Sequence, residues 1–358
     1  MPIPSFAATT APHPIARSPY PANGIARLGG SDFVSIPRVE GHSETPSVAV
    51  IQNGQPVAFP GNGWNDWKPG DDGLDSFVCV NAIHPYRGSL WCVDQGQAPG
   101  ADTSFEAQKI VEIDPQSGGI RQILRFARDY MPEGATLNDL RIYEDLLFAT
   151  DSGIGGVVIH NLATGETRRR LSQHPAARKP ADQERKGTGG HPLAQADGTP
   201  PDPTQSDMLE VTPDGELFLW ATPTGPIRAI PMEALLSDRS DEEIATEIFV
   251  YAQTPNIGGT AMDDRGNLYV SDIETRQVTV ISSDGLSEVL VRDNRLKSPD
   301  ALLIAEDRKL LIPCPQLEYL ASTNGGTDGT EAPFEVMETD LPDHLGQIKL
   351  GDAIWPKA

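Results

Sequence analysis

Residues 258–293, GGTAMDDRGNLYVSDIETRQVTVISSDGLSEVLVRD, hold four short apolar segments within 36 residues. Polar turns separate these segments, among them Asp264-Arg265-Gly266 and Ser283-Asp284-Gly285. Segments that alternate with period 2 or are continuously apolar, and that lie between Gly/Asp turns, are typical of β-strands joined by hairpins. The stretch therefore predicts one four-stranded antiparallel unit.

The same succession of strand and turn recurs along most of the chain. Five looser copies begin with NGIARLG at residue 23, SFVCVNAI at 76, LNDLRIY at 137, DMLEVTP at 207 and DALLIAE at 300, and KLLIPC, LEYLA and QIKL complete the last. All-β repeats of this length favour a propeller over a solenoid, because blades around an axis leave only short, protected edges. We predict an all-β fold, a six-bladed β-propeller with four-stranded antiparallel blades over residues 23–358, after an N-terminal extension at 1–22.

Charge and composition restrict the partners. The 358 residues carry 51 acidic and 28 basic side chains, a net charge of −23, which repels nucleic acid and anionic membranes. The basic cluster Arg168–Arg170, together with Arg178, Lys179, Arg185 and Lys186, is interpreted as a solvated flank. The three cysteines lack the close Cys/His spacing of a zinc site. We expect a small-molecule substrate, no nucleic acid, no membrane, and a monomer or weak oligomer.

Targeting signals are not evident. The chain has no run of about 18 apolar residues, and its first residues, MPIPSFAATTAPHPIAR, lack a basic start followed by a continuous apolar stretch. We expect a soluble cytoplasmic protein, or a secreted one if a leader has been removed.

Polar residues open most of the predicted inner strands, which start at one mouth of the channel. Amide and carboxylate oxygens that converge there are ligands for Ca²⁺ or Mg²⁺, and the candidate ligands are Asn23, Asn138, Asp207 and Asp300. Alternatively, these residues only cap turns before strands. Gly258 interrupts the ring, and without a metal the carboxylates would raise one another's pKa and supply a general acid or base.

Loops at the same mouth supply candidate catalytic and binding residues. His42 is the candidate for proton transfer because its ordinary pKa is near 6.5. The alternative interpretation is an exposed loop histidine without a function. Asp139 is a second proton carrier, and Arg38 would stabilise negative charge. The candidate substrate-binding residues are Trp64, Trp67, Asp151, Thr260 and Cys314. We expect the two tryptophans either to stack on a ligand or to fill a blade junction. Residues 174–205 are expected to form either a lid over the mouth or a mobile surface insertion.

An ordered set of motifs carries a family resemblance: LWCVDQG at 90–96, KIVEIDP at 109–115, LNDLRI at 137–142, ATDSG at 149–153 and VVIHNLATG at 157–165. Over residues 24–321 the chain resembles the Yellow/major royal jelly protein family, which includes L-dopachrome-tautomerase-related proteins, and more distantly the SMP-30/gluconolactonase-like propellers. The resemblance implies a six-bladed propeller. It also implies a Glu/Asn/Asn/Asp metal ring in the lactonases, with Asn23, Asn138 and Asp207 at comparable positions and Gly258 where an aspartate is expected.

Three functions follow as hypotheses. The leading one is an isomerase, tautomerase or cyclase that acts on a quinone-like or conjugated metabolite of secondary metabolism at the channel mouth. The alternatives are a metal-dependent, gluconolactonase-like hydrolase and a non-catalytic ligand-binding propeller. No G-x-S-x-G, P-loop, HExxH or CxxC motif supports a different enzyme class.

Overall fold

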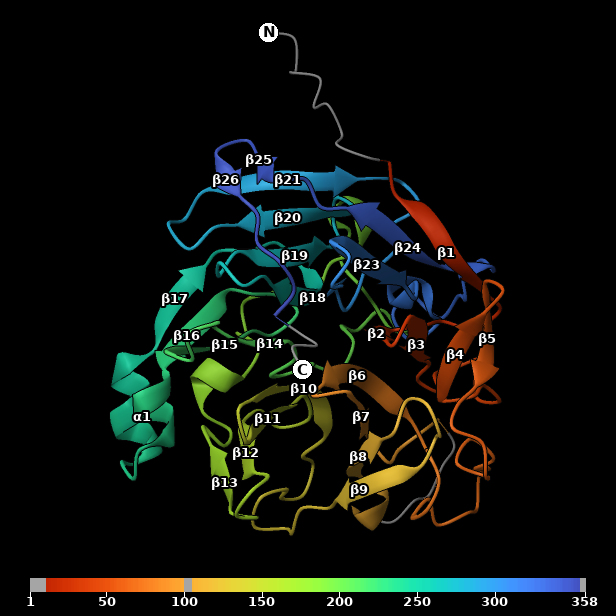
Figure 1. The fold of residues 1–358 in the computed structure, drawn as a ribbon, viewed down its shortest axis with the longest axis horizontal. Coiled ribbons are helices and arrows are strands. Elements are labelled where there is room, and N and C mark those ends of the chain that lie inside the picture. Colours follow the sequence, from red (N-terminus) through yellow and green to blue (C-terminus); the bar gives the residue numbers. More distant parts are fainter. Residues whose placement is uncertain (1–10, 100–104, 355–358) are drawn as a thin grey trace, which may run out of the picture.

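The computed structural model describes residues 11–99 and 105–354, and confirms a six-bladed β-propeller of four-stranded antiparallel sheets around a central axis (Figure 1). Blades one to three contain β2 (Gly24–Leu28), β3 (Ser31–Ser35), β4 (Val48–Gln52) and β5 (Gln55–Ala58); β6 (Val80–Tyr86), β7 (Ser89–Asp94), β8 (Lys109–Ile113) and β9 (Ile120–Leu124); and β10 (Leu137–Tyr143), β11 (Leu146–Asp151), β12 (Val157–Asn161) and β13 (Thr167–Arg170).

Blades four to six contain β14 (Leu209–Val211), β15 (Leu217–Trp220), β16 (Ile227–Pro231) and β17 (Phe249–Ala252); β18 (Ile257–Met262), β19 (Leu268–Asp272), β20 (Gln277–Ile281) and β21 (Ser287–Arg292); and β22 (Leu303–Ile304), β23 (Lys309–Cys314), β24 (Phe334–Asp340) and β1 (His13–Ser18). Two short helices, α1 (Met232–Leu236) and α2 (Asp241–Ile244), connect β16 to β17.

The sixth blade combines the two ends of the chain. Strand β1 pairs antiparallel with β24, so the outermost strand of the last blade comes from the N-terminal side. The structure thus differs from the boundary predicted at residue 23. The predicted strand LEYLA is a 3₁₀ turn at Leu317–Tyr319, and QIKL contributes β26 (Ile348–Lys349), which pairs with β25 (His344–Leu345) in a separate hairpin.

Apolar side chains fill the spaces between neighbouring blades. The cluster around Leu140 and Trp91 joins blades two and three, and the cluster around Phe148 and Trp220 joins blades three and four. Four further clusters occupy the remaining junctions. Because each sheet packs against a neighbour on both faces, its central strands are almost fully buried. In β11 five of the six residues are buried and the sixth is half-buried.

Each mouth of the channel is covered by a different part of the chain. Residues 174–205 leave blade three and are fastened to blades five and six, where the Gly189 N–H donates to the Glu274 carbonyl at 2.8 Å and Ala194 forms a bridge with Asn324. At the opposite mouth the C-terminal segment reaches the axis, and Ala353 forms a bridge with Asp263 (Figure 1).

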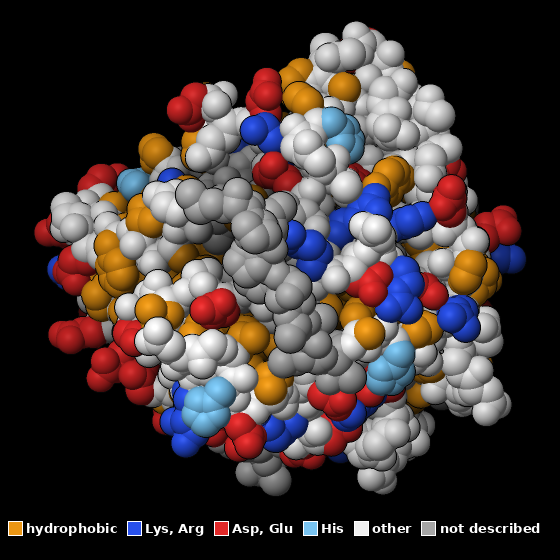
Figure 2. Space-filling model, turned by 90° about the horizontal axis from the view of Figure 1, so that it is seen from above, with side chains coloured by type: hydrophobic (Ala, Val, Ile, Leu, Met, Phe, Trp, Pro, Cys, Tyr) orange, Lys and Arg blue, Asp and Glu red, His pale blue; other side chains and the backbone are white. Residues whose placement is uncertain are grey.

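Charges on the surface are mixed. Acidic and basic side chains are interspersed on the face shown in Figure 2, the uppermost in Figure 1. The predicted solvated flank is wrong for part of its residues: Arg168, Arg169 and Arg170 form ion pairs with Asp238, Asp151 and Asp241, and the side chains of Arg169 and Arg170 are largely buried. In the ranges 11–99 and 105–354, none of the helices has the length and apolar character to cross a bilayer.

Blades five and six approach closely at two glycines. A Cβ atom on Gly258 would lie 2.2 Å from the Pro299 carbonyl oxygen, and one on Gly259 would lie 2.7 Å from the Ala301 Cα. These distances leave no room for a side chain. Packing of the sixth blade against β18 therefore explains why the fifth blade contributes no polar side chain at this level.

We expect Gly258→Ala to reduce the free energy of unfolding by about 1–3 kcal/mol, because the added methyl group forces apart two backbones. Chemical denaturation measures the change. Gly61→Ala is the matched control, since a Cβ there meets nothing within 4 Å, and it should change stability by less than about 0.5 kcal/mol. Equal stability of the two variants would contradict the close approach.

Candidate functional site

A cavity of about 290 Å³ lies on the axis beneath residues 174–205. The polar side chains that open the inner strands line it: Asn23, Asn81, Asn138, Asp207 and Asp300, from blades one, two, three, four and six. The four candidate metal ligands are thus brought together from positions up to 277 residues apart. Gly258 lines the cavity at the place of the fifth blade.

Asparagine amides form a directional chain around this ring. Asn23 Nδ2 donates to the Asn81 carbonyl at 3.2 Å, Asn81 Nδ2 donates to the Asn138 carbonyl at 3.1 Å, and Asn138 Nδ2 donates to Asp207 Oδ1. The chain leaves one acceptor unused, because the buried Asn23 Oδ1 has no hydrogen-bond partner among the described residues. A buried acceptor without a partner costs about 1–3 kcal/mol, so this atom favours a ligand that offers positive charge or a donor.

Two carboxyl groups in the ring are difficult to ionise. Burial raises the pKa of Asp207 to about 7, against the attraction of Arg185. Burial, together with repulsion from Asp207, holds the pKa of Asp300 well above its usual range. A cation between these groups would favour their ionised forms.

The donor set fits a hard divalent cation. Asparagine and carboxylate oxygens are the ligands that Ca²⁺ takes, and the unpartnered Asn23 Oδ1 and the two buried carboxyl groups are suited to one. No cluster of three or more His, Cys, Asp or Glu side chains able to hold a metal occurs within 11–99 and 105–354. A cation here would therefore depend on the asparagine oxygens as well as on the aspartates.

Asn81 was missed because the second blade was predicted to open at Asp75-Ser76. Its inner strand is β6, which begins at Val80 and places Asn81 in the ring. Asn81 lies 58 residues after Asn23 and 57 before Asn138. That regular spacing is the sequence signal that would have identified it.

Arg185 was predicted to lie on a solvated flank, but it lines the cavity, as does the neighbouring Lys186. Arg185 belongs to residues 174–205, and its Nη1 donates to Thr204 Oγ1 at 3.3 Å. Burial lowers the pKa of Arg185, while Asp207 and Asp300 oppose this shift. The surrounding sequence has no strand period that would show which of its basic residues faces inward.

Residues 174–205 form one wall of the cavity, with Arg185, Lys186, Leu193 and Thr204 in its lining. The wall is held by specific polar contacts. Thr188 Oγ1 donates to Glu318 Oε1 at 2.6 Å, and the Lys186 N–H donates to Asn256 Oδ1 at 3.0 Å. The segment therefore encloses the polar ring rather than lying free on the surface.

The three predicted catalytic residues do not meet. His42 is half-buried and packs edge-on against Phe334 with 5.3 Å between ring centroids, outside the cavity lining. Burial lowers the pKa of His42. Arg38 is buried, and its Nη1 donates to the Phe77 and Val78 carbonyls at 2.6 Å each. Its guanidinium thus joins blades one and two through backbone oxygens.

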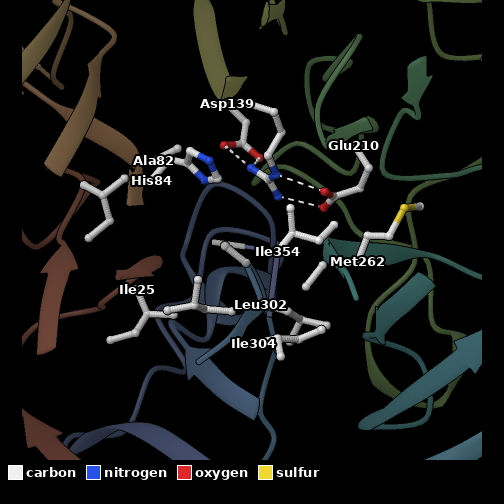
Figure 3. Close-up of a pocket in the computed structure, with 14 residues that line it drawn as sticks. Ile25, Ala82, His84, Asp139, Glu210, Met262, Leu302, Ile304 and Ile354 are labelled. Atoms are coloured by element: carbon white, nitrogen blue, oxygen red, sulfur yellow. Dashed lines mark hydrogen bonds and ion pairs between the residues drawn. The ribbon is translucent and has the colours of Figure 1, made fainter. Parts of the chain in front are cut away.

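Asp139 lies on the far side of the ring, in a second, smaller cavity of about 40 Å³ (Figure 3). Asn138 lines the central cavity and Asp139 the smaller one, at a point where the pairing of β10 with β11 is irregular between Leu137 and Leu140. Arg141 lies between two carboxylates, 3.2 Å from Asp139 and 2.8 Å from Glu210. This layer of buried charge separates the central cavity from the opposite mouth, where Ile354 also lines the smaller cavity.

The predicted tryptophans fill a blade junction, as the alternative interpretation held. Trp64 packs against Phe77 with 4.9 Å between ring centroids, and Trp67 is only 5% exposed, next to Val78. The Arg38 guanidinium lies 5.3 Å from the Trp67 ring. Neither ring lines the central cavity, so stacking on a ligand there is not possible in this arrangement.

The other predicted binding residues have internal partners and do not line the central cavity. Asp151 accepts a hydrogen bond from Arg169 Nη2 at 2.6 Å. Thr260 Oγ1 donates to Glu210 Oε1 at 2.8 Å. Cys314 is buried between apolar side chains of blades five and six, and burial raises the pKa of its thiol.

Comparisons with known proteins identify the fold but no family. No family model and no curated protein sequence matches the chain. Similar solved structures include a candidate gluconolactonase (TM-score 0.55, 13% identity, 93% of this chain and 92% of the other) and a luciferin-regenerating enzyme (0.54, 10%, 93% and 96%). A calcium-binding regucalcin from Agrobacterium tumefaciens is also similar (0.51, 12%, 85% of both chains).

At these identities the likeness shows the fold alone. The structural neighbours include a regucalcin and a candidate gluconolactonase, which agrees with the more distant of the two resemblances seen in the sequence. Membership of the Yellow/major royal jelly protein family stays a prediction. The chain shares the architecture of this wider group of propellers.

Proposed function

We propose that the protein hydrolyses lactones, the cyclic esters of small organic molecules, in its central cavity. One observation carries the proposal: an enclosed ring of asparagine and aspartate side chains in which the buried Asn23 Oδ1 lacks a partner. Two of the similar structures, described as a candidate gluconolactonase and a calcium-binding protein, support the same direction.

Asn23, Asn138, Asp207 and Asp300 would hold a divalent cation, with Ca²⁺ the best match to their oxygens. When bound, such a cation supplies Lewis-acid polarisation of a carbonyl and a lower pKa for water. The amide chain fixes the ring, because Asn81 and Asn138 are each held by their neighbours.

The wall above the ring supplies positive charge. Arg185 lines the cavity from this wall and can donate hydrogen bonds to a polar group of the substrate that lies away from the ring. Residues 174–205 exclude bulk water, which strengthens these interactions. Hydrolysis then breaks the ring C–O bond and releases a hydroxy acid.

A second candidate function is the isomerisation or cyclisation of a conjugated metabolite. The observation that favours it is the pKa of about 7 at Asp207, which permits this group to accept and return a proton at neutral pH. Since His42, Asp139 and Arg38 do not converge, Asp207 would be the proton carrier.

Turnover of a panel of five- and six-membered lactones, followed by acid release, tests the proposal. We expect hydrolysis that is lost on chelation and restored by Ca²⁺, and a loss of at least about 100-fold in kcat for Asp207→Asn. Asp202→Asn, an exposed aspartate on the covering segment, is the matched control and should keep full activity. Rearrangement of a conjugated substrate without hydrolysis would favour the isomerase, and a tightly held ligand without turnover would favour a binding protein.

Calcium binding should depend on pH. Below about pH 7 Asp207 is protonated in the metal-free protein, so a proton must leave when the cation binds. We expect the apparent Ca²⁺ affinity to fall at least about tenfold for each pH unit below 7, and more steeply wherever Asp300, whose pKa is also raised, must lose its proton too. Calorimetric titration at pH 5 to 8 measures this dependence. A pH-independent affinity would show that Asp207 is not a ligand.

A further inference from the structure

Arg185 has more hydrogen-bonding capacity than the protein uses. A guanidinium carries five N–H donors, and the hydrogen bond to Thr204 Oγ1 is the one that Arg185 makes with side-chain or backbone acceptors in the described ranges 11–99 and 105–354. No ion pair within 4.0 Å involves it in those ranges, although Asp207 and Asp300 are near enough to influence it electrostatically. The remaining donors are therefore available to a molecule in the cavity.

The backbone around Arg185 is fixed. The Leu193 N–H donates to the Arg185 carbonyl at 2.9 Å, and the adjacent Lys186 forms a bridge with Pro192. The Lys186 N–H also donates to Asn256 Oδ1, which joins this turn to the fifth blade. A guanidinium held on an ordered turn is suited to selective recognition, because little conformational freedom is lost when it binds.

The cavity is lined by charges of both signs. Glu318 of the sixth blade is one of them, and its carboxylate accepts a hydrogen bond from Thr188. Arg185 and Lys186 lie on the covering wall, and the asparagine and aspartate oxygens lie in the ring. A ligand that spans about 290 Å³ would meet both, and this volume suits one small ring with a single substituent. The planar fork of an arginine matches a carboxylate, to which it can donate two parallel hydrogen bonds.

We propose that Arg185 recognises a carboxylate on the substrate, so that the protein acts on small lactones that are also acids. This inference rests on the proposed function and adds the substrate class to it. The carboxylate lies under the covering segment, and the ester carbonyl faces the ring. An alternative is that Arg185 only compensates the charge of Asp207 and Asp300, in which case acidic and neutral ligands would be affected alike by its loss.

A matched pair of substrates separates these roles: γ-butyrolactone-γ-carboxylate and its uncharged carboxamide. We expect the wild-type protein to prefer the acid, and Arg185→Met to lower kcat/KM for the acid by about 10- to 100-fold while changing that for the carboxamide less than about threefold. Arg185→Lys, which keeps the charge but not the fork, should be intermediate. Arg178→Met, an exposed arginine on the same segment, is the control and should change neither value. An equal loss with both substrates would overturn the proposal.

A ligand that cannot be hydrolysed keeps the inference testable if lactones are not substrates. Tetrahydrofuran-2-carboxylate has the ring and the carboxylate but no ester carbonyl, and calorimetry measures its binding directly. We expect the wild-type protein and the Arg178→Met variant to bind it, and Arg185→Met to bind it at least about 10-fold more weakly. Binding without lactone turnover would refute the lactonase while supporting recognition of the carboxylate. No difference between wild type and Arg185→Met would refute that recognition.

Discussion

Burial of both faces of every sheet is the constraint on which the molecule depends. Each blade leaves apolar side chains on two sides, and only a neighbour on each side removes them from water. A ring satisfies this condition only when it is closed, and pairing of β1 with β24 joins the two ends of the described chain in one sheet. The same closure brings inner-strand starts from five blades to one axis, so the position of the candidate site follows from the packing of the blades.

Much of the fold could be predicted because its signals are local. Alternating apolar residues and Gly/Asp turns define each hairpin within about ten residues. The position of β1 could not be predicted in this way, since it pairs with β24 more than 300 residues later and nothing in HPIARS specifies that partner. The third strand of the last blade was also predicted at the wrong place. It is β24 at Phe334–Asp340, whereas the predicted LEYLA forms a 3₁₀ turn.

The predicted topology placed the residues at strand starts correctly, whereas the positions of side chains on loops could not be predicted from the sequence. Asn23, Asn138, Asp207 and Asp300 meet as expected because strand starts converge on the axis, although their chemical roles remain predictions. His42, Arg38 and the two tryptophans lie on loops whose side-chain directions the strand pattern does not determine. Arg38 shows the result: backbone carbonyls of the next blade engage a guanidinium that was expected to serve a ligand.

The layer formed by Asp139, Arg141 and Glu210 has a consequence for how a ligand could enter and leave the central cavity. Together with Ile354 it lines the smaller cavity, on the side of the central cavity remote from residues 174–205. A ligand of the central cavity would meet buried ion pairs on that side, and residues 174–205 form the wall on the other. Under the proposed function, movement of residues 174–205 would then control the release of product.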